Sequence, residues 1–286
     1  MPSRACLLLC LGWVALAIPA GGPPAWAAPP HRIVSLDLCT DQLLVDLAPR
    51  ERIAAVTHLA ADPSVSAVPE KARGLRVTRG GAEDVLRTDP DLVLAGPYGV
   101  SATVDLLRRL GRNVVVVPLA QDIDGIRASV RTVAAAIGEP ARGEEAIAAF
   151  DRRIAALHPA RPAKREPTAI VYQVGGVVSG QGSLADALLA ATGFHNMAAD
   201  YRLTHAGQVP LEAMVAMPPD LLILSSAPNA YATALADNLR HPAIAWLQAR
   251  HASLELPWPL WLCGTPHVLD AMERLAAARD HLRRAH

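Results

Sequence analysis

One pattern of hydrophobic and polar positions occurs twice along the chain, at residues 83–97 (EDVLRTDPDLVLAGP) and at residues 212–228 (EAMVAMPPDLLILSSAP). Each copy begins with a Glu and a short segment with apolar residues at helical spacing, and a Pro-Asp pair follows at the same distance. An unbroken apolar run then ends at small residues and a Pro, which is typical of a strand buried on both faces. The repeated pattern therefore predicts a helix, a tight turn and a buried strand in each of two similar α/β lobes.

The segments around the first copy predict a lobe with a parallel sheet. Apolar runs indicate strands at residues 31–36, 53–56 and 113–117, and helical periodicity indicates a helix at 101–110. Residues 37–41 are expected to turn into a helix that continues through Leu47. The polar, Pro-containing stretch at 62–79 is expected to be a loop with little regular structure. Strands and helices alternate at short spacing, and this order favours parallel strands.

The middle of the chain predicts long helices. Residues 123–157 follow a helical pattern that is interrupted near Gly138, Glu139 and Pro140. Because Pro140 lacks an amide hydrogen, it is expected to begin a new helix rather than continue the old one. The helical stretch at 141–158 is expected to be roughly 27 Å long, enough to run between two lobes. We therefore divide the chain into an N-terminal lobe (28–140), a connecting helix and linker (141–166) and a C-terminal lobe (167–286).

The second half predicts another α/β lobe. Its expected strands are at 168–173 and 253–256, and its expected helices are at 184–192, 231–239, 243–249 and 266–282. Gly175 and Gly176 follow the first of these strands and are expected to make a turn. Trp258 and Trp261 stand in a Pro-rich loop just before the closing helix.

The first 27 residues have the pattern of an export signal. Arg4 supplies a positive region, the apolar stretch at 5–18 is short for a membrane span, and Ala25-Trp26-Ala27 offers a cleavage site before Ala28. Leu9 precedes Cys10 where a lipoprotein signal requires a small residue, so a lipid anchor is less favoured. We therefore expect the protein in the periplasm.

Composition and charge narrow the classes of function. With 286 residues, 51% of them hydrophobic, the chain is long enough for one large or two modest α/β domains. The formal net charge is +0 and no basic run is interleaved with aromatic residues, so no nucleic acid is expected as a partner. The chain contains no Gly-x-Ser-x-Gly elbow, phosphate-binding loop or dinucleotide fingerprint. No local motif therefore favours enzyme activity, and no cofactor is expected. A Ser-His-Asp triad, whose members are scattered in any fold, has no local signature.

Two cysteines follow the expected signal: Cys39 after the first strand and Cys263 before the closing helix. In an oxidising compartment they can form a disulfide, stay unpaired inside the structure, or contact a ligand or metal. The sequence leaves these three alternatives open. Cys263 and His267 match no compact metal motif by themselves, so no metal site is predicted.

The few aromatic residues gather at strand ends rather than inside periodic elements. Tyr98 ends the first repeat, Tyr231 follows the second, and Trp258 and Trp261 precede the closing helix. Ligands of α/β lobes bind in the crevice at the carboxyl ends of the strands, so these side chains are expected to face a cleft. Flat apolar rings suit a large planar or macrocyclic ligand.

Together these segments resemble the periplasmic substrate-binding proteins of the iron-siderophore and vitamin B12 class. The resemblance is carried by RIVSLDLCTDQLLVDL (32–47), PDLVLAG (90–96), LLRRLGRNVVVVP (106–118), VVSGQGSLADALLAATG (177–193) and VPLEAMVAMPPDLLIL (209–224). It implies the class III fold, in which two Rossmann-like lobes with central sheets are joined by a long rigid helix. It also implies capture of a metal chelate between the lobes and delivery to an inner-membrane ABC permease with its ATPase, without a chemical step. We expect a monomer.

By this resemblance, loops at the strand ends line the cleft. The ligand-binding residues it implies are Asp37, Leu38, Cys39, Thr40, Tyr98, Tyr231, Trp258, Trp261 and Cys263. Cys39 and Cys263 then approach the cleft from different lobes. This slightly favours ligand contact, and it also permits a cross-lobe disulfide if their Cα atoms lie within about 7 Å.

Members of the class commonly present one Glu per lobe to the permease. The matching positions fall near Ser101, which has no charge, and near Asp237, which is expected to serve as the docking residue of the second lobe. The cleft segments offer Tyr and Trp but little Arg, which favours a corrinoid, then an Fe(III)-siderophore, then haem or another chelate. The alternative functions are a periplasmic sensor or adaptor and an exported hydrolase, and the missing nucleophile elbow disfavours the hydrolase.

Overall fold

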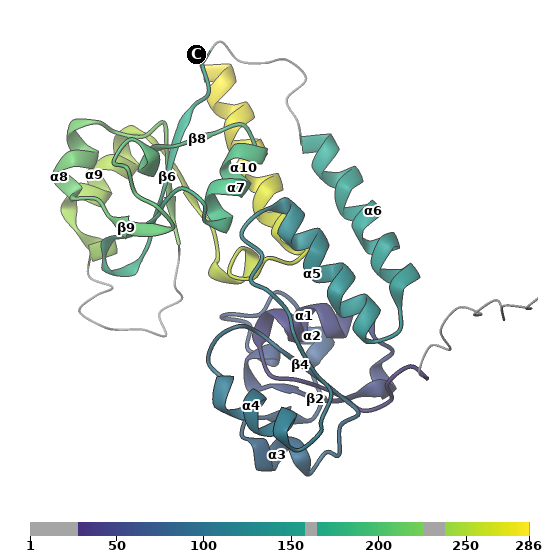
Figure 1. Cartoon of the computed structure of the whole chain (residues 1–286). Coiled ribbons are helices and arrows are strands. Elements are labelled where there is room, and N and C mark those ends of the chain that lie inside the picture. The colour runs from purple at the N-terminus through teal and green to yellow at the C-terminus, as the bar shows by residue number, and fades with distance from the viewer. Residues whose placement is uncertain (1–27, 158–164, 226–237, 286) are drawn as a thin grey trace, which may run out of the picture.

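The computed structural model describes residues 28–157, 165–225 and 238–285, which fold into two α/β lobes (Figure 1). Helices α5 (Ile123–Ala136) and α6 (Pro140–Leu157) lie side by side and run from one lobe towards the other. Within the described ranges, no helix combines the length and the apolar character needed to cross a membrane. The expected export signal lies outside these ranges.

The N-terminal lobe is built on a parallel sheet with the strand order β3-β2-β1-β4-β5. Its strands are β1 (Ile33–Ser35), β2 (Ile53–Thr57), β3 (Val77–Thr78), β4 (Leu92–Ala95) and β5 (Val114–Val116). Its helices are α1 (Leu38–Leu47), α2 (Pro69–Ala72), α3 (Ala82–Leu86) and α4 (Ser101–Arg109). The strand order reverses between β1 and β4, and the carboxyl ends of strands at such a switch point commonly hold a ligand.

The described part of the C-terminal lobe has a mixed sheet with the order β11-β10-β6-β7-β9, and β8 pairs with β6. Its strands are β6 (Thr168–Tyr172), β7 (Val177–Ser179), β8 (His195–Asn196), β9 (Ala206–Gln208), β10 (Leu221–Leu224) and β11 (Ala252–Glu255). Its helices are α7 (Leu184–Ala191), α8 (Leu211–Ala216), α9 (Pro242–Arg250) and α10 (Val268–Ala285). Strands β6, β10 and β11 are parallel, whereas β7 runs antiparallel to β6 and β9.

Alternate side chains of the central strands enter separate hydrophobic cores on the two faces of each sheet. In β4, Leu92 and Leu94 pack in one core and Val93 packs in the other. In β10, Leu221 and Leu222 are divided between two cores in the same way. Since successive side chains of a strand point to opposite faces, a strand covered on both sides is apolar at every position. The predicted buried strands of both repeats are confirmed.

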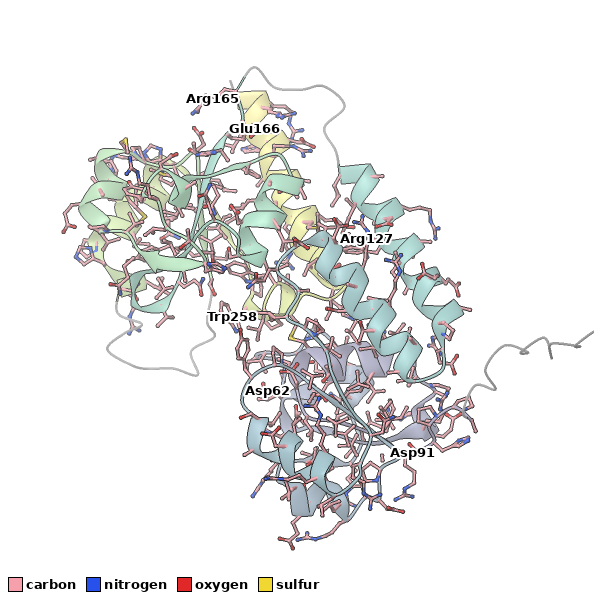
Figure 2. All side chains as sticks on the ribbon, viewed as in Figure 1. Asp62, Asp91, Arg127, Arg165, Glu166 and Trp258 are labelled. Carbon is pink, nitrogen blue, oxygen red and sulfur yellow. A yellow bond between two sulfur atoms is a disulfide. The ribbon has the colours of Figure 1, made fainter. Side chains whose placement is uncertain are left out.

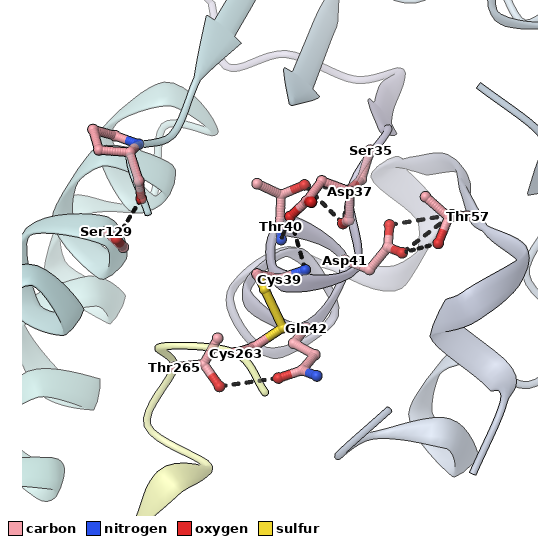
Figure 3. The surroundings of a disulfide bond; sticks show 11 residues. Ser35, Asp37, Cys39, Thr40, Asp41, Gln42, Thr57, Ser129, Cys263 and Thr265 are labelled. Atoms are coloured by element: carbon pink, nitrogen blue, oxygen red, sulfur yellow. Dashed lines mark hydrogen bonds between the residues drawn. A yellow bond between two sulfur atoms is a disulfide. The ribbon is translucent and has the colours of Figure 1, made fainter. Parts of the chain in front are cut away.

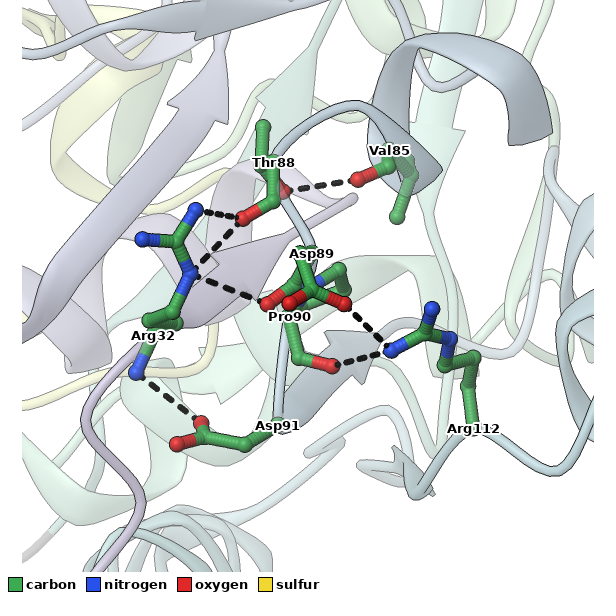
Figure 4. A network of polar contacts seen from close by, with 7 residues as sticks. All are labelled: Arg32, Val85, Thr88, Asp89, Pro90, Asp91 and Arg112. Atoms are coloured by element: carbon green, nitrogen blue, oxygen red, sulfur yellow. Dashed lines mark hydrogen bonds and ion pairs between the residues drawn. The ribbon is translucent and has the colours of Figure 1, made fainter.

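The Pro-Asp pair of each repeat has the same structural role in the two lobes. The Asp91 carboxylate accepts a hydrogen bond from the backbone N–H of His31 (2.6 Å), just before β1. It also accepts one from the backbone N–H of Arg32 (2.9 Å; Figure 4). The Asp220 carboxylate accepts hydrogen bonds from the backbone N–H (2.7 Å) and the hydroxyl (3.0 Å) of Thr168, at the start of β6. Each carboxylate thus joins its repeat to the beginning of the neighbouring strand.

Helices α5 and α6 belong to the cores of both lobes. In α6, Ile147 packs in a core of the N-terminal lobe, whereas Phe150 packs in a core of the C-terminal lobe. In α5, Val130 packs in the same core of the N-terminal lobe, and Ile126 packs in the same core of the C-terminal lobe. Pro140 begins α6 as predicted, and the expected fold class, two α/β lobes with a long connecting helix, is confirmed.

Some local structure differs from the prediction. The stretch at 62–79, which was expected to be an irregular loop, contains α2 and β3. Strand β3 is two residues long and is held by its pairing with β2. The turn at Gly175 and Gly176 is present, but the short strands β7, β8 and β9 that follow were not predicted. Strands of this length depend on pairing with distant segments, which a local pattern does not show.

Candidate functional site

The loop after β1 is shaped by the start of α1. Asp37 caps this helix, because its Oδ1 atom accepts hydrogen bonds from the backbone N–H groups of Cys39 (2.9 Å) and Thr40 (3.3 Å) (Figure 3). The Thr40 hydroxyl donates to the Asp37 carbonyl at 2.9 Å and lies 2.7 Å from the Ser35 hydroxyl. This network holds Asp37 and Cys39 at the carboxyl edge of the parallel sheet.

The turn after β4 approaches the same loop closely. A Cβ atom on Gly96 would lie 2.6 Å from Cγ of Asp37, so only glycine fits here while the capping side chain stays in place. Pro97 and Tyr98, the next residues in the chain, therefore lie close to Asp37, at the switch point between β1 and β4.

A pocket of about 50 Å³ lies where these loops meet the C-terminal lobe, and we call it the interlobe pocket. Its walls come from the loop after β1, the turn after β4 and the segment after β5, with one residue from the other lobe. The lining residues are Asp37, Cys39, Thr40, Leu43, Pro97, Tyr98, Val117, Pro118, Leu119, Ala120, Ser129 and Gly264. Tyr98 is 72% exposed and Leu119 is 45% exposed, so both offer apolar surface to a ligand.

The two tryptophans before α10 differ in burial. Trp261 is 6% exposed and belongs to a core of the C-terminal lobe, and Trp258 packs against that core while remaining partly exposed. Their rings form an edge-to-face pair with centroids 5.8 Å apart. Figure 2 shows Trp258 on the side of the C-terminal lobe that faces the N-terminal lobe. Trp258 is therefore the tryptophan with surface available near the lobe boundary.

Cys39 and Cys263 form a disulfide bond between the lobes (Figure 3). Their Cα atoms are 5.2 Å apart, within the range that a disulfide allows. Of the three alternatives left open by the sequence, the structure has the disulfide, so neither sulfur is a thiolate that could bind a metal. In the part of the chain that the structure describes, no group of three or more His, Cys, Asp or Glu side chains could hold a metal ion.

The interlobe pocket carries little charge. Asp37 is the one acidic residue of its described lining, which contains no Lys, Arg or His. Behind the pocket, the buried Asp41 accepts hydrogen bonds from the hydroxyl (2.5 Å) and the backbone N–H (3.2 Å) of Thr57. Burial raises the pKa of Asp41 to about 6, and hydrogen bonds from Ser35 and Thr57 only partly oppose this effect.

The structure brings several of the predicted site residues together. Four of them line the interlobe pocket, namely Asp37, Cys39, Thr40 and Tyr98. Cys263 is buried and reaches the pocket through its disulfide, and Leu38 is buried without lining the pocket. Tyr231 and Asp237 lie outside the described residues.

The sequence prediction missed one wall of the pocket. Pro118, Leu119 and Ala120 follow β5 and line the pocket beside the two predicted loops. The family resemblance implied the loop after β1, and the carboxyl end of a buried strand singled out Tyr98 after β4. The strand-end signal applies equally to β5. Leu119 carries neither a polar group nor an aromatic ring, so its residue type gave no sign of a ligand contact.

These features define a class of protein: two α/β lobes, joined by paired helices, with a pocket between them at the carboxyl ends of parallel strands. A family model described as periplasmic binding protein matches residues 33–249. The chain therefore belongs to the periplasmic binding protein family.

Known proteins resemble this chain in sequence and in fold. A cobalamin-binding protein of Halobacterium salinarum is 29% identical over 197 residues, which cover 68% of this chain and 53% of that protein. The chain thus spans about half the length of the curated relatives it matches. The periplasmic heme-binding protein RhuT from Roseiflexus sp. RS-1, in its apo form, is 26% identical with a TM-score of 0.74, over 88% of this chain and 98% of that one. The vitamin B12 binding protein BtuF of Vibrio cholerae has the same fold, with 20% identity and a TM-score of 0.68 over 89% and 98% of the two chains.

Proposed function

We propose that this protein is the substrate-binding component of an ABC importer in the periplasm, which captures a metal chelate between its two lobes and delivers it to an inner-membrane permease. The interlobe pocket of about 50 Å³ is smaller than the roughly 300 Å³ or more of a small-molecule site, so it would receive only part of the ligand. The observation that carries this proposal is the position of the pocket, at the carboxyl edge of the parallel sheet and against Gly264 of the other lobe. The similar proteins include a cobalamin-binding and a heme-binding protein, which supports a chelate as the ligand.

Among chelates, a corrinoid fits the described lining best. Tyr98 and Leu119 offer exposed apolar surface, which suits a bulky macrocycle. The lining contains no Lys, Arg or His to pair with the carboxylates of haem or the anionic groups of many ferric chelates. The segment at 226–237, outside the described residues, also contains no Lys, Arg or His. An Fe(III)-siderophore is the second choice and haem the third.

The test is a thermal-shift titration with cyanocobalamin, a ferric hydroxamate, a ferric catecholate and haemin. A ligand at 100 times its dissociation constant should stabilise the protein by about 2.7 kcal/mol, and we expect this for cyanocobalamin. A shift with haemin or a ferric chelate alone would contradict the corrinoid assignment and keep the transport role. No shift with any of the four would contradict capture of a metal chelate.

The variant Tyr98→Ala tests whether the interlobe pocket is the binding site. Loss of the exposed ring should weaken cyanocobalamin binding by about 1 to 2 kcal/mol, or roughly tenfold in dissociation constant. Trp246→Ala is the matched control, because Trp246 is a 36% exposed aromatic residue on α9 that does not line the pocket. Calorimetric titration of both variants should separate them, and equal affinities would place the ligand elsewhere.

Docking to a permease forms part of the same proposal. We retain Asp237 as the docking residue of the C-terminal lobe on the strength of the sequence. Ser101 is the exposed first residue of α4 and supplies no charge at the matching position of the N-terminal lobe.

A further inference from the structure

Three side chains on one face of α1 bind the segment that leads into α10. Cys39 forms the disulfide with Cys263, the Gln42 Oε1 atom accepts a hydrogen bond from the Thr265 hydroxyl at 3.0 Å, and Asp46 Oδ2 lies 2.6 Å from His267 Nε2. We call these six residues the seam. On α1 they are three and four positions apart, so they lie on one face of the helix, and on the opposing segment they occupy every second position. Figure 3 shows the disulfide and the Gln42–Thr265 contact beside each other.

The centre of the seam is closed to solvent. Gln42 is 0% exposed, Thr265 is 1% exposed and Cys263 is 2% exposed. A Cβ atom on Gly264 would lie 2.5 Å from Cβ and 2.8 Å from the carbonyl oxygen of Ala120, so the backbone at Gly264 touches the segment after β5. At Gly264 the C-terminal lobe therefore packs against both α1 and the segment after β5.

The seam forms one boundary of the interlobe pocket. Cys39 and Gly264 line the pocket, whereas Asp46 and His267 line a separate groove of about 530 Å³. Leu43, on α1 beside the seam, lines both spaces, so the pocket and the groove adjoin at the part of α1 that carries the seam. A separation of α1 from the segment at 263–267 would open this boundary and join the pocket to the groove.

We propose that the seam sets the distance between the lobes, and thereby the width of the interlobe pocket, with the Cys39–Cys263 bond as the restraint that prevents this boundary from opening. The bond holds the two Cα atoms 5.2 Å apart, and it is covalent whereas the neighbouring contacts of the seam are hydrogen bonds. Cys39 and Cys263 are therefore positioning residues for ligand capture. This inference rests on the proposed binding function for its effect on ligands, but its effect on the lobes is independent of any ligand.

The experiment compares wild-type protein with the double variant Cys39→Ala/Cys263→Ala, using hydrogen exchange and ligand dissociation. In the absence of ligand, backbone exchange in α1 and in residues 263–267 should become faster in the variant. The dissociation rate of cyanocobalamin should rise about tenfold, as expected when lobe separation and ligand binding are coupled. Exchange in β4 and β10, at the centres of the two sheets, reports the loss of global stability, and the increase at the seam should exceed this reference.

Chemical reduction supplies the matched control. A dithiol passes two electrons and two protons to the Cys39–Cys263 bond, which yields two thiols and the cyclic disulfide of the reductant. Reduced wild-type protein should behave like the double variant, and the same reductant should leave the double variant unchanged.

The outcomes separate this inference from the proposed function. Unchanged exchange at the seam in the double variant would overturn the inference, whether or not a ligand binds. Faster exchange with an unchanged dissociation rate would overturn the claim that the seam sets the width of the pocket. If no chelate binds the wild-type protein, the proposed function fails, and exchange at the seam still decides whether the bond holds the lobes together.

Discussion

Asp41 is a buried carboxylate of α1 that faces the end of β2, and no described residue places an opposite charge in contact with it. It fixes Thr57 through two hydrogen bonds, and this links the first turn of the helix beneath the interlobe pocket to the neighbouring strand. Burial of a charged group without a counter-ion is costly, and the raised pKa of Asp41, about 6, is the consequence.

The raised pKa of Asp41 predicts a pH dependence of stability. The folded state binds this proton more tightly than the unfolded state, whose carboxyl has the ordinary value of 3.8. Its contribution to stability is thus complete below pH 3.8 and is lost as the pH rises through about 6. The full change is on the order of 3 kcal/mol for a difference of about two pKa units. Asp41→Asn should flatten this part of the profile in urea unfolding between pH 4 and pH 7, and an identical slope in both proteins would contradict the assignment.

The sequence predicted the lining of the interlobe pocket best at residues that directly follow a strand. Tyr98 was identified because it follows a buried strand, Asp37 and Thr40 were implied by the family resemblance, and all three line the interlobe pocket. Gln42 and Asp46 were not identified, because polar residues on a helix are ordinarily exposed. Their contacts with Thr265 and His267 depend on how the second lobe is placed.

At the scale of elements, the repeat has a physical explanation. In each lobe a short helix is followed by an aspartate and then by a strand buried on both faces. The aspartate carboxylate accepts a hydrogen bond from a backbone N–H at the start of the adjacent strand. The strand begins one residue after that aspartate, at Leu92 in one lobe and at Leu221 in the other. The sequence therefore predicted these units well, since each is determined by neighbouring residues. It did not reveal β7 to β9, whose pairing depends on distant segments.

Replacement of the repeated aspartate should destabilise its lobe. Asp220→Ala removes the acceptor of the Thr168 N–H and hydroxyl groups and should cost about 1 to 3 kcal/mol. Arg165→Ala is the matched control, since it removes only an ion pair whose Arg165 side chain is 71% exposed, and it should cost less than about 1 kcal/mol. Urea denaturation measures both values. Equal losses for the two variants would show that the ion pair, rather than the strand start, is what Asp220 supports.

At the scale of the whole molecule, the disulfide links residues separated by 224 positions. Cross-linking so long a segment restricts the unfolded chain, and the chain-entropy model gives about 5 kcal/mol for a loop of this size. Reduction of the wild-type protein should therefore lower its urea midpoint substantially, whereas the double alanine variant should have a low midpoint with and without reductant. Wild-type midpoints that do not respond to complete reduction would contradict this stabilisation.

The whole-molecule arrangement was only partly accessible from the sequence. The two lobes and the helix that begins at Pro140 follow from periodicity and from the chemistry of proline. The pairing of Cys39 with Cys263 remained one of three alternatives, because it depends on the distance between two lobes that no local pattern encodes. The roles of Tyr231 and Asp237 remain predictions, since both lie outside the described residues.

The Cys39–Cys263 bond also closes most of the chain into a covalent ring. A single cut in any peptide bond between these two residues opens the ring without dividing the molecule, so both fragments stay attached through sulfur. Only a cut before Cys39 or after Cys263 releases a piece at once. A protein nicked between its lobes thus keeps its full mass and travels as one band on a non-reducing gel. The damage becomes visible only when a reductant is added.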